Sequence, residues 1–181
     1  MTDQAPIKAP GDAARVEPAT LEDLEELTNL LVTLFEEEED FVPNREKQMH
    51  GIRLILEQPS RGRIFVVRND HALIGMVNLL FTISTAEGGF VVLMEDLVIH
   101  PDHRGQGYGS MLLDYVKDFA KSKDFRRVTL LTDSISQPSQ RFFQRHGYVY
   151  SHMIPMRLVL GNSPETSEAG REEEEEEEEE E

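Results

Sequence analysis

The spacing of hydrophobic and polar residues predicts a chain in which helices and strands are interspersed. Leucines recur at helical spacing after Thr20, and Thr20 together with Asp23 forms a helix-start signal. Runs rich in β-branched and aromatic residues, bounded by turn residues, predict strands. The predicted helices are 20–40, 45–56, 108–121 and 138–146, and the predicted strands are 14–18, 63–68, 72–83, 90–99, 127–131, 148–150 and 153–160.

The order of these elements predicts a mixed α/β sheet rather than a doubly wound one. Three strands between residues 63 and 99 follow one another through short turns, which is typical of an antiparallel meander. The strand at 127–131 follows a helix, so we expect it to pair in parallel with strand 90–99 through a right-handed crossover. The length of 181 residues suits a single domain. We expect a flexible lead-in at 1–12, the domain at 13–160 and a disordered acidic tail at 161–181.

Negative charge is concentrated at the C-terminal end of the sequence. The net charge is −17, of which residues 171–181, one arginine and ten glutamates, contribute −9. Such a block repels itself and cannot bury apolar surface, so we expect it to be disordered. The remaining −8 disfavours nucleic acid as a partner and mildly favours cationic substrates such as amines.

Several classes of site and location are excluded or disfavoured by what the sequence lacks. It contains no cysteine, which excludes disulfides, thiolate metal sites and cysteine nucleophiles. Residues 1–11 lack the apolar stretch of a signal peptide, and no run approaches membrane-spanning length. We therefore expect a cytoplasmic protein without a membrane partner.

Residues 100–113 carry the clearest chemical signal in the chain. Pro101 ends a buried strand, glycines follow at 105, 107 and 109, and an amphipathic helix begins. A glycine loop entering a helix directs unpaired backbone N–H groups and the positive end of the helix dipole at one point, which suits phosphate. Arg104 adds a positive charge with planar donors. One alternative is a dinucleotide-binding fingerprint, which requires a third glycine where this chain has Ser110, and another is a purely structural turn.

The spacing Arg104-x-x-Gly107-x-Gly109 resembles the pyrophosphate loop of the GNAT superfamily, the N-acetyltransferases that use acetyl-CoA. Residues 95–99 resemble the central strand of that family, and residues 142–148 resemble its late helix-to-strand turn, so the resemblance extends over the predicted domain. It implies a GNAT-like acyl-CoA acyltransferase fold with a mostly antiparallel sheet of about six to seven strands, a splayed central pair and about four flanking helices. It also implies acetyl-CoA as co-substrate and no metal.

The resemblance assigns the binding of acetyl-CoA to two groups of residues. The main chain of the central strand pairs with the pantetheine arm, and an N–H near Val98 stabilises the oxyanion. The glycine loop holds the pyrophosphate, and Ser139 stands where family members often carry an asparagine that contacts pantetheine. The cofactor-binding residues predicted in this way are Leu97, Val98, Ile99, Arg104, Gly105, Gln106, Gly107, Tyr108, Gly109, Ser110, Ser139 and Phe143.

Acyl transfer to an amine requires a base, because a free amine is mostly ammonium at pH 7 and must lose a proton before it attacks. By resemblance Glu95 is the candidate base, and Asp96 is a candidate contact to the amine. Successive side chains on a strand point to opposite faces, so the two acids line the same face only if a bulge intervenes. The alternative is that one acid merely makes a buried hydrogen bond, although acids in an apolar strand are costly.

One feature of the family pattern is missing from this chain. Family members often use a tyrosine of the last helix to protonate the leaving CoA thiolate, and Phe143 replaces that tyrosine here. The thiolate could leave unaided or take a proton from water, because a free thiol ionises not far above neutrality. Tyr108, Tyr148 and Tyr150 are candidate substitutes, whose hydroxyls the sequence does not place.

The sequence says least about the amine that accepts the acetyl group. In the family, the segment between the first two helices shapes the acceptor pocket, so we expect substrate contacts at 35–45. Nothing suggests a long peptide groove, and we therefore expect a small-molecule amine as acceptor. A protein lysine or N-terminus and a non-catalytic CoA-binding module are the alternatives, and a homodimer is compatible with the resemblance.

Overall fold

A computed structural model describes residues 14–37 and 42–160 of the chain. The chain divides after Tyr148 into two units, and every helix and strand of the described residues lies in the first unit. The lead-in predicted at 1–12 and the tail predicted at 161–181 lie outside the described residues. Among the residues that are described, no helix is both long enough and apolar enough to cross a membrane.

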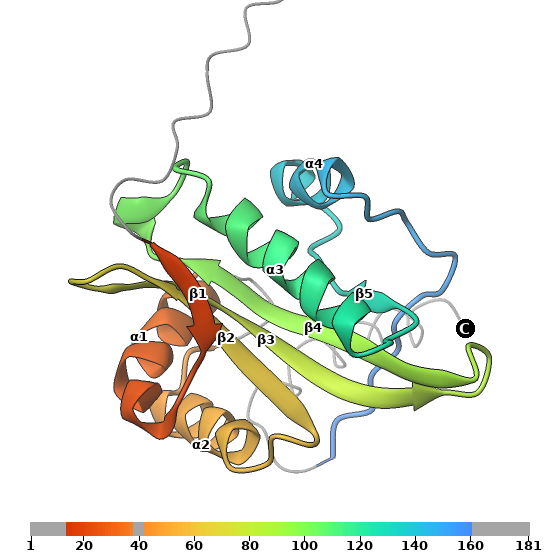
Figure 1. Ribbon diagram of the computed structural model, residues 1–181, viewed down its shortest axis with the longest axis horizontal. Coiled ribbons are helices and arrows are strands. Elements are labelled where there is room, and N and C mark those ends of the chain that lie inside the picture. The colour runs from red at the N-terminus through yellow and green to blue at the C-terminus, as the bar shows by residue number, and fades with distance from the viewer. Residues whose placement is uncertain (1–13, 38–41, 161–181) are drawn as a thin grey trace, which may run out of the picture. The chain divides into compact units, whose positions relative to one another are not determined.

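One five-stranded sheet runs through the first unit in the order β1-β2-β3-β4-β5 (Figure 1). The first four strands pair antiparallel, and β5 pairs in parallel with β4, as the sequence predicts. The parallel ladder is short, because its last pair is Met94 with Leu130 while β4 continues to Ile99. The strands are β1 (Arg15–Pro18), β2 (Gly62–Arg68), β3 (Leu73–Ser84), β4 (Gly89–Ile99) and β5 (Val128–Leu130).

Helices pack on both faces of this sheet (Figure 1). On one face, leucines of α1 at helical spacing, such as Leu27, are buried together with Val66 of β2. On the other face, Leu112 of α3 is buried together with Phe65, the neighbouring residue of β2. The α-helices are α1 (Leu24–Phe35), α2 (Arg45–Leu56), α3 (Tyr108–Ser122) and α4 (Gln137–Arg145).

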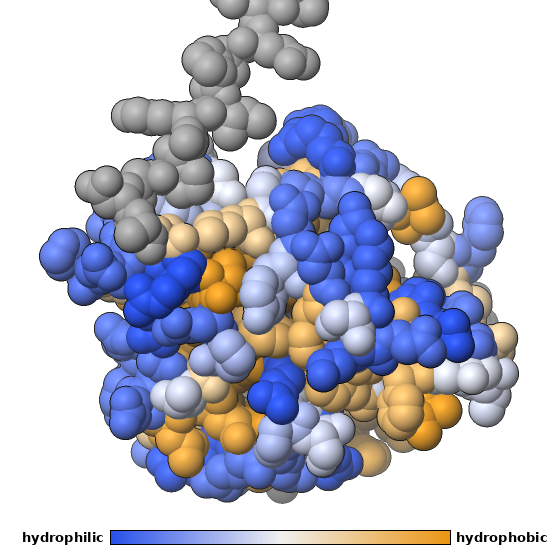
Figure 2. Space-filling model, in the orientation of Figure 1, coloured by the Kyte–Doolittle hydropathy of each residue, from blue (hydrophilic) through white to orange (hydrophobic). Residues whose placement is uncertain are grey.

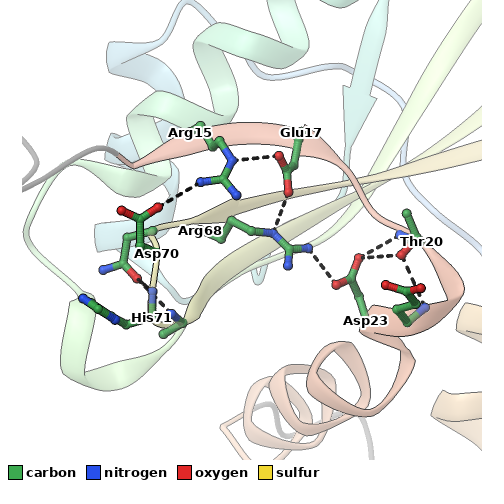
Figure 3. Close-up of polar contacts among 10 residues, drawn as sticks. Arg15, Glu17, Thr20, Asp23, Arg68, Asp70 and His71 are labelled. Atoms are coloured by element: carbon green, nitrogen blue, oxygen red, sulfur yellow. Dashed lines mark hydrogen bonds and ion pairs between the residues drawn. The ribbon is translucent and has the colours of Figure 1, made fainter.

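The first helix begins with the capping arrangement that the sequence predicts. A short 3₁₀ turn, η1 (Leu21–Asp23), leads into α1, and the Thr20 N–H donates to Asp23 Oδ2 at 2.8 Å. The other oxygen of the buried Asp23 pairs with Arg68 at 2.7 Å, and Arg68 pairs with Glu17 at 2.8 Å (Figure 3). This network joins β1, β2 and the start of α1.

The strands predicted at 148–150 and 153–160 are wrong, because residues 149–160 form neither helix nor strand. The described residues therefore make a sheet of five strands rather than six to seven. The apolar side chains of residues 149–160 are exposed, with Met156 at 94% and Val149 at 88%. An apolar, β-branched segment has strand propensity, but a strand exists only where a neighbouring strand takes up its backbone hydrogen bonds.

On the face shown in Figure 2, hydrophilic side chains cover much of the surface, with smaller hydrophobic areas between them.

Candidate active site

A bulge interrupts the pairing of β3 and β4 at the two acids. On β3, the paired positions Met76 and Asn78 are separated by one residue, whereas their partners on β4, Val98 and Glu95, are separated by two. Asp96 is one of these two and has a φ of +48°, a left-handed conformation that residues other than glycine rarely adopt. The extra residue changes the alternation of side chains along β4.

The bulge brings both acids to the same side of the sheet. Asn78 lies opposite Glu95, and directly opposed residues of neighbouring strands share a face. The same Asn78 donates from Nδ2 to Asp96 Oδ2 at 3.1 Å. Strict alternation would have sent the two acids to opposite faces, and it does not hold here because the bulge is present. Met76 and Val98, which flank the bulge, are buried with the leucines of α1, so this is the face that α1 covers.

Asp96 and Asn78 form a pair whose hydrogen-bonding capacity is only partly used. Burial raises the pKa of the Asp96 carboxyl above its ordinary value of 3.8, and the hydrogen bond from Asn78 acts in the opposite direction. The Asn78 side chain is buried, with the residue 4% exposed. Its Oδ1 accepts no hydrogen bond from any residue that the structure describes. The site therefore contains a buried acceptor atom beside a carboxylate.

The glycine loop connects β4 to α3 through a compact turn. It begins with the 3₁₀ turn η2 (Pro101–His103), and Gly105 and Gly107 then adopt φ values of +72° and +91°, which glycine adopts at little cost. Met111 N–H donates to Gly107 O at 3.0 Å, so the N–H groups of the preceding helical residues have no partner within α3. Apart from Gly107 and its two chain neighbours, no atom of the described residues lies within 4 Å of a Cβ built at Gly107. This arrangement fits a phosphate group.

Arg104 is held at the rim of the loop by two contacts. Its Nε donates to Ile99 O at 2.9 Å, and its NH1 pairs with Glu37 Oε1, also at 2.9 Å. Glu37 follows α1 and lies near the start of the predicted acceptor segment. Its carboxylate therefore forms an ion pair with the Arg104 guanidinium, which the resemblance assigns to pyrophosphate. Both side chains are exposed, at 43% and 48%, so the pair is weak and a phosphate could replace the carboxylate.

A contact that the sequence analysis missed joins the glycine loop to α4. Ser110 Oγ lies 3.0 Å from His146 Nε2, and the His146 ring packs against Phe142 with ring centroids 5.0 Å apart. A Cβ on Gly109 would come within 3.2 Å of the Phe142 ring, so glycine permits this close approach. The first turn of α3 and the end of α4 are therefore in direct contact.

Helix α4 carries the two remaining predicted residues, Ser139 and Phe143. Ser139 accepts a hydrogen bond from a neighbouring serine of the same segment, and the Phe143 ring contacts the ring of Tyr148 at 5.8 Å. The Tyr148 hydroxyl donates to Met94 Sδ at 3.9 Å, and burial raises the pKa of Tyr148 above its ordinary value of 10.0. Met94 is the last residue of β4 that pairs with β5. The Tyr148 hydroxyl thus lies where the two strands stop pairing.

The second half of β4 is not paired with β5. Residues 97–99 lie beyond the last pair with β5, while β3 pairs with Val98 and Ile99 on the other edge. Backbone groups of this half are therefore not taken up by β5. In the predicted acceptor segment, residues 38–41 lie outside the described part, and the described residues Phe35 and Arg45 mark the ends of the flanking helices.

A cavity lies beside α1 and adjoins the start of the glycine loop at His103. Its volume is about 350 Å³, and its lining includes His71, His100 and His103. Residues of the β4 bulge are not among those that line it. Within residues 14–37 and 42–160, no cluster of three or more His, Cys, Asp or Glu side chains could hold a metal ion.

The five-stranded mixed sheet, with a bulged β4 that extends past β5 and runs into a glycine loop, has the fold of acetyltransferases of known structure. The profile of the Acetyltransferase (GNAT) family matches residues 24–148, and the chain belongs to this family. It is an N-acetyltransferase with acetyl-CoA as co-substrate.

Known proteins resemble the chain over most of their lengths. It is 28% identical to the aminoalkylphosphonate N-acetyltransferase of Salmonella typhimurium over 134 residues, which are 74% of this chain and 84% of that protein. The structure of a predicted acetyltransferase with acetyl-CoA from Clostridium acetobutylicum has a TM-score of 0.65 at 15% identity, over 80% of this chain and 96% of that one. The ribosomal-protein-alanine N-acetyltransferase from Brucella melitensis biovar Abortus 2308 has a TM-score of 0.67 at 19% identity, over 82% and 100%. At these identities the two structures show a shared fold alone.

Proposed function

We propose that this chain transfers acetyl from acetyl-CoA to the primary amine of a small molecule by direct attack. The observation that carries the proposal is the β4 bulge, which puts Glu95 and Asp96 on one side of the sheet, beside the half of β4 that extends past β5. The Salmonella relative is named for a small amine, which supports this class of acceptor. The Brucella neighbour is named for a protein amine, so a protein acceptor is the alternative.

Glu95 is the proposed general base, and Asp96 is the proposed contact to the amine. Glu95 takes a proton from the bound ammonium, directly or through a water molecule, and frees the nitrogen lone pair. The nitrogen then forms a bond to the thioester carbonyl carbon. When the tetrahedral intermediate collapses to the amide, the nitrogen loses a second proton to water. Asp96 accepts a hydrogen bond from an N–H that the amine retains, and thereby orients the lone pair toward the open edge of β4.

Main-chain and tyrosine groups are proposed to stabilise the charges that develop as the C–S bond breaks. By family resemblance, an N–H near Val98 donates to the oxyanion. The electron pair of the breaking bond leaves with the sulfur, and Tyr148 is the proposed proton donor in place of Phe143. Its hydroxyl donates to the thioether sulfur of Met94, and burial holds the pKa of Tyr148 above its ordinary value, so it is protonated at neutral pH.

Calorimetric titration tests whether the chain binds acetyl-CoA through its glycine loop. The wild-type protein should bind acetyl-CoA, and Gly107→Glu should abolish binding because it places a charged side chain in the phosphate loop. Gly88→Glu is the matched control, since Gly88 also has a positive φ of +63° and open space around it, but lies in the β3–β4 turn. Equal loss of binding in both variants would show that strain, rather than the loop, is responsible.

Measuring the release of CoA thiol with a panel of amines tests whether the acceptor is a small primary amine. Turnover with small primary amines supports the proposed acceptor class, and turnover only with peptides supports the protein alternative. Binding of acetyl-CoA without turnover of any small amine or peptide would contradict the enzyme reading and leave a CoA-binding module.

A further inference from the structure

The Asn78 side chain is a polar group that neither the family resemblance nor the proposed mechanism uses. It lies within the apolar strand β3 and is 4% exposed. A buried amide without its hydrogen bonds costs free energy, so such groups are normally satisfied. The amide nitrogen of Asn78 donates a hydrogen bond to Asp96, but the amide oxygen, Oδ1, accepts none from the described residues.

The unused oxygen belongs to the same site as the two acids. Asn78 is the register partner of Glu95 and the hydrogen-bond donor to Asp96. Because the amide oxygen and nitrogen share one carbon atom, Oδ1 lies beside the Asp96 carboxylate. Asp96 also has the left-handed backbone of the bulge, and strained residues next to unsatisfied polar groups gather where a ligand completes the structure.

We infer that Asn78 is an acceptor-binding residue that selects primary amines: its Oδ1 accepts a hydrogen bond from the amine, while its Nδ2 holds Asp96 in place. The inference rests on the proposed function, because it requires an amine at the bulge. A primary ammonium has three N–H groups. After Glu95 has taken one proton, two remain, and the carboxylate of Asp96 and the Oδ1 of Asn78 are the two acceptors for them.

A secondary amine lacks the hydrogen that this arrangement requires. Once deprotonated it retains a single N–H, which Asp96 can accept, and Asn78 Oδ1 is then left buried beside an alkyl group. A site that leaves a buried polar atom unpaired discriminates strongly against the incomplete ligand. The wild-type protein should therefore favour a primary amine over its N-methyl counterpart in kcat/KM.

The test compares kcat/KM for one primary amine and its N-methyl counterpart in wild type and in Asn78→Leu. The substitution removes the acceptor Oδ1 together with the Nδ2 donor to Asp96, while keeping a side chain of similar size. We expect kcat/KM for the primary amine to fall about 10- to 100-fold, because a hydrogen bond to the amine is lost. The secondary amine should lose less, so that the preference for primary amines falls. The dissociation constant of acetyl-CoA should not change.

Thr28→Val is the matched control, because it also replaces a buried polar side chain with an apolar one of similar size. Thr28 lies on α1, and its hydroxyl donates to Leu24 O of the same helix at 2.7 Å. It should leave the preference for primary amines unchanged. If Asn78→Leu does not fold, Asn78→Ser gives the same comparison, because the shorter side chain of serine places no acceptor at the position of Oδ1.

Two different results identify two different failures. Equal losses for the primary and secondary amine in both Asn78 variants would overturn the inference and leave Asn78 with a structural role, while the proposed function stands. A wild-type protein that binds acetyl-CoA but acetylates no amine would overturn the proposed function and the inference together.

Discussion

Asp23 and Asp96 are two acids that the fold shields from water, and they are held in different ways. Asp23 receives the Arg68 guanidinium at 2.7 Å and the Thr20 N–H at 2.8 Å (Figure 3). Asp96 receives one amide N–H from Asn78 at 3.1 Å and has a left-handed backbone. The first carboxylate is engaged on both oxygens in holding two strands and a helix together. The second lies beside an unused acceptor, where β4 extends past β5.

We interpret this difference as that between a structural acid, Asp23, and the proposed functional acid, Asp96. A carboxylate that serves the fold is satisfied by charge and hydrogen bonds, because an unsatisfied one destabilises the native state. Strain and unsatisfied polar groups persist where a bound substrate will complete them. Substitutions should therefore change the free energy of unfolding at Asp23 and the rate of acetyl transfer at the bulge.

The largest expected effect is on turnover at the bulge. Glu95→Gln keeps the size of the side chain but cannot take a proton, so kcat with an amine acceptor should fall about 100- to 10,000-fold. CoA thiol release at saturating substrate measures this, while acetyl-CoA binding and the melting temperature should stay near wild type. Glu87→Gln, which removes only an ion pair with Arg127 near the β3–β4 turn, is the control. An unchanged kcat in Glu95→Gln would move the role of base to Asp96.

The converse effect is expected at the structural acid. Asp23→Asn weakens the helix cap and leaves the Arg68 guanidinium with Glu17 alone, so the free energy of unfolding should fall by about 2 to 3 kcal/mol. Urea unfolding measures this change, and the kcat of the folded fraction should not change. Asp70→Asn, which removes an exposed ion pair with Arg15, should leave stability within error. Loss of kcat without loss of stability in Asp23→Asn would erase the contrast between the two acids.

The sequence predicts the elements that depend on local patterns. Helix α2 occupies Arg45–Leu56 as predicted, and the cap formed by Thr20 and Asp23 is present, because caps and hydrophobic spacing are properties of a few neighbouring residues. The parallel pairing of β5 with β4 follows from chain order and handedness. The two closing strands were overpredicted because propensity does not supply a pairing partner.

The bulge and the side chains around it depend on long-range register, which no local pattern specifies. A bulge is a mismatch between two strands, and its only local sign is a pair of adjacent acids in an apolar strand. Asn78 has a similar sign, a lone amide within the apolar run of β3, that could have marked it. Glu37 and His146 meet partners 67 and 36 residues away, and sequence spacing gives no indication of either contact.

A smaller effect, on the pH dependence of stability, tests whether Asp96 carries a cost. Because burial raises the pKa of Asp96, the native state binds a proton that the unfolded state has already lost between the ordinary value of 3.8 and the raised value. Stability therefore falls as pH rises through this window, and the full cost is present above it. Asp96→Asn removes that cost, so the variant should gain stability over wild type at neutral pH and lose this advantage in acid.

Urea unfolding of wild type and Asp96→Asn from pH 3.5 to 8 measures this difference. Asp23→Asn supplies the opposite pattern, because it should remain less stable than wild type at neutral pH, where the ion pair with Arg68 is intact in wild type. A difference between Asp96→Asn and wild type that does not vary with pH would show that the carboxylate is not destabilised by burial.

The smallest expected effect concerns Tyr148, whose hydroxyl is also weakly satisfied, by Met94 Sδ at 3.9 Å. Tyr148→Phe should lower kcat less than about 10-fold, because a CoA thiolate is a moderate base that can also take its proton from water. Tyr115→Phe, in an aromatic contact with Phe65 at 4.9 Å, should leave kcat unchanged. An unchanged kcat in Tyr148→Phe would mean that the thiolate leaves unaided or takes its proton from water. A loss as large as that of Glu95→Gln would make proton donation as important as proton removal, and Tyr148 would then perform the role of the tyrosine that Phe143 replaces.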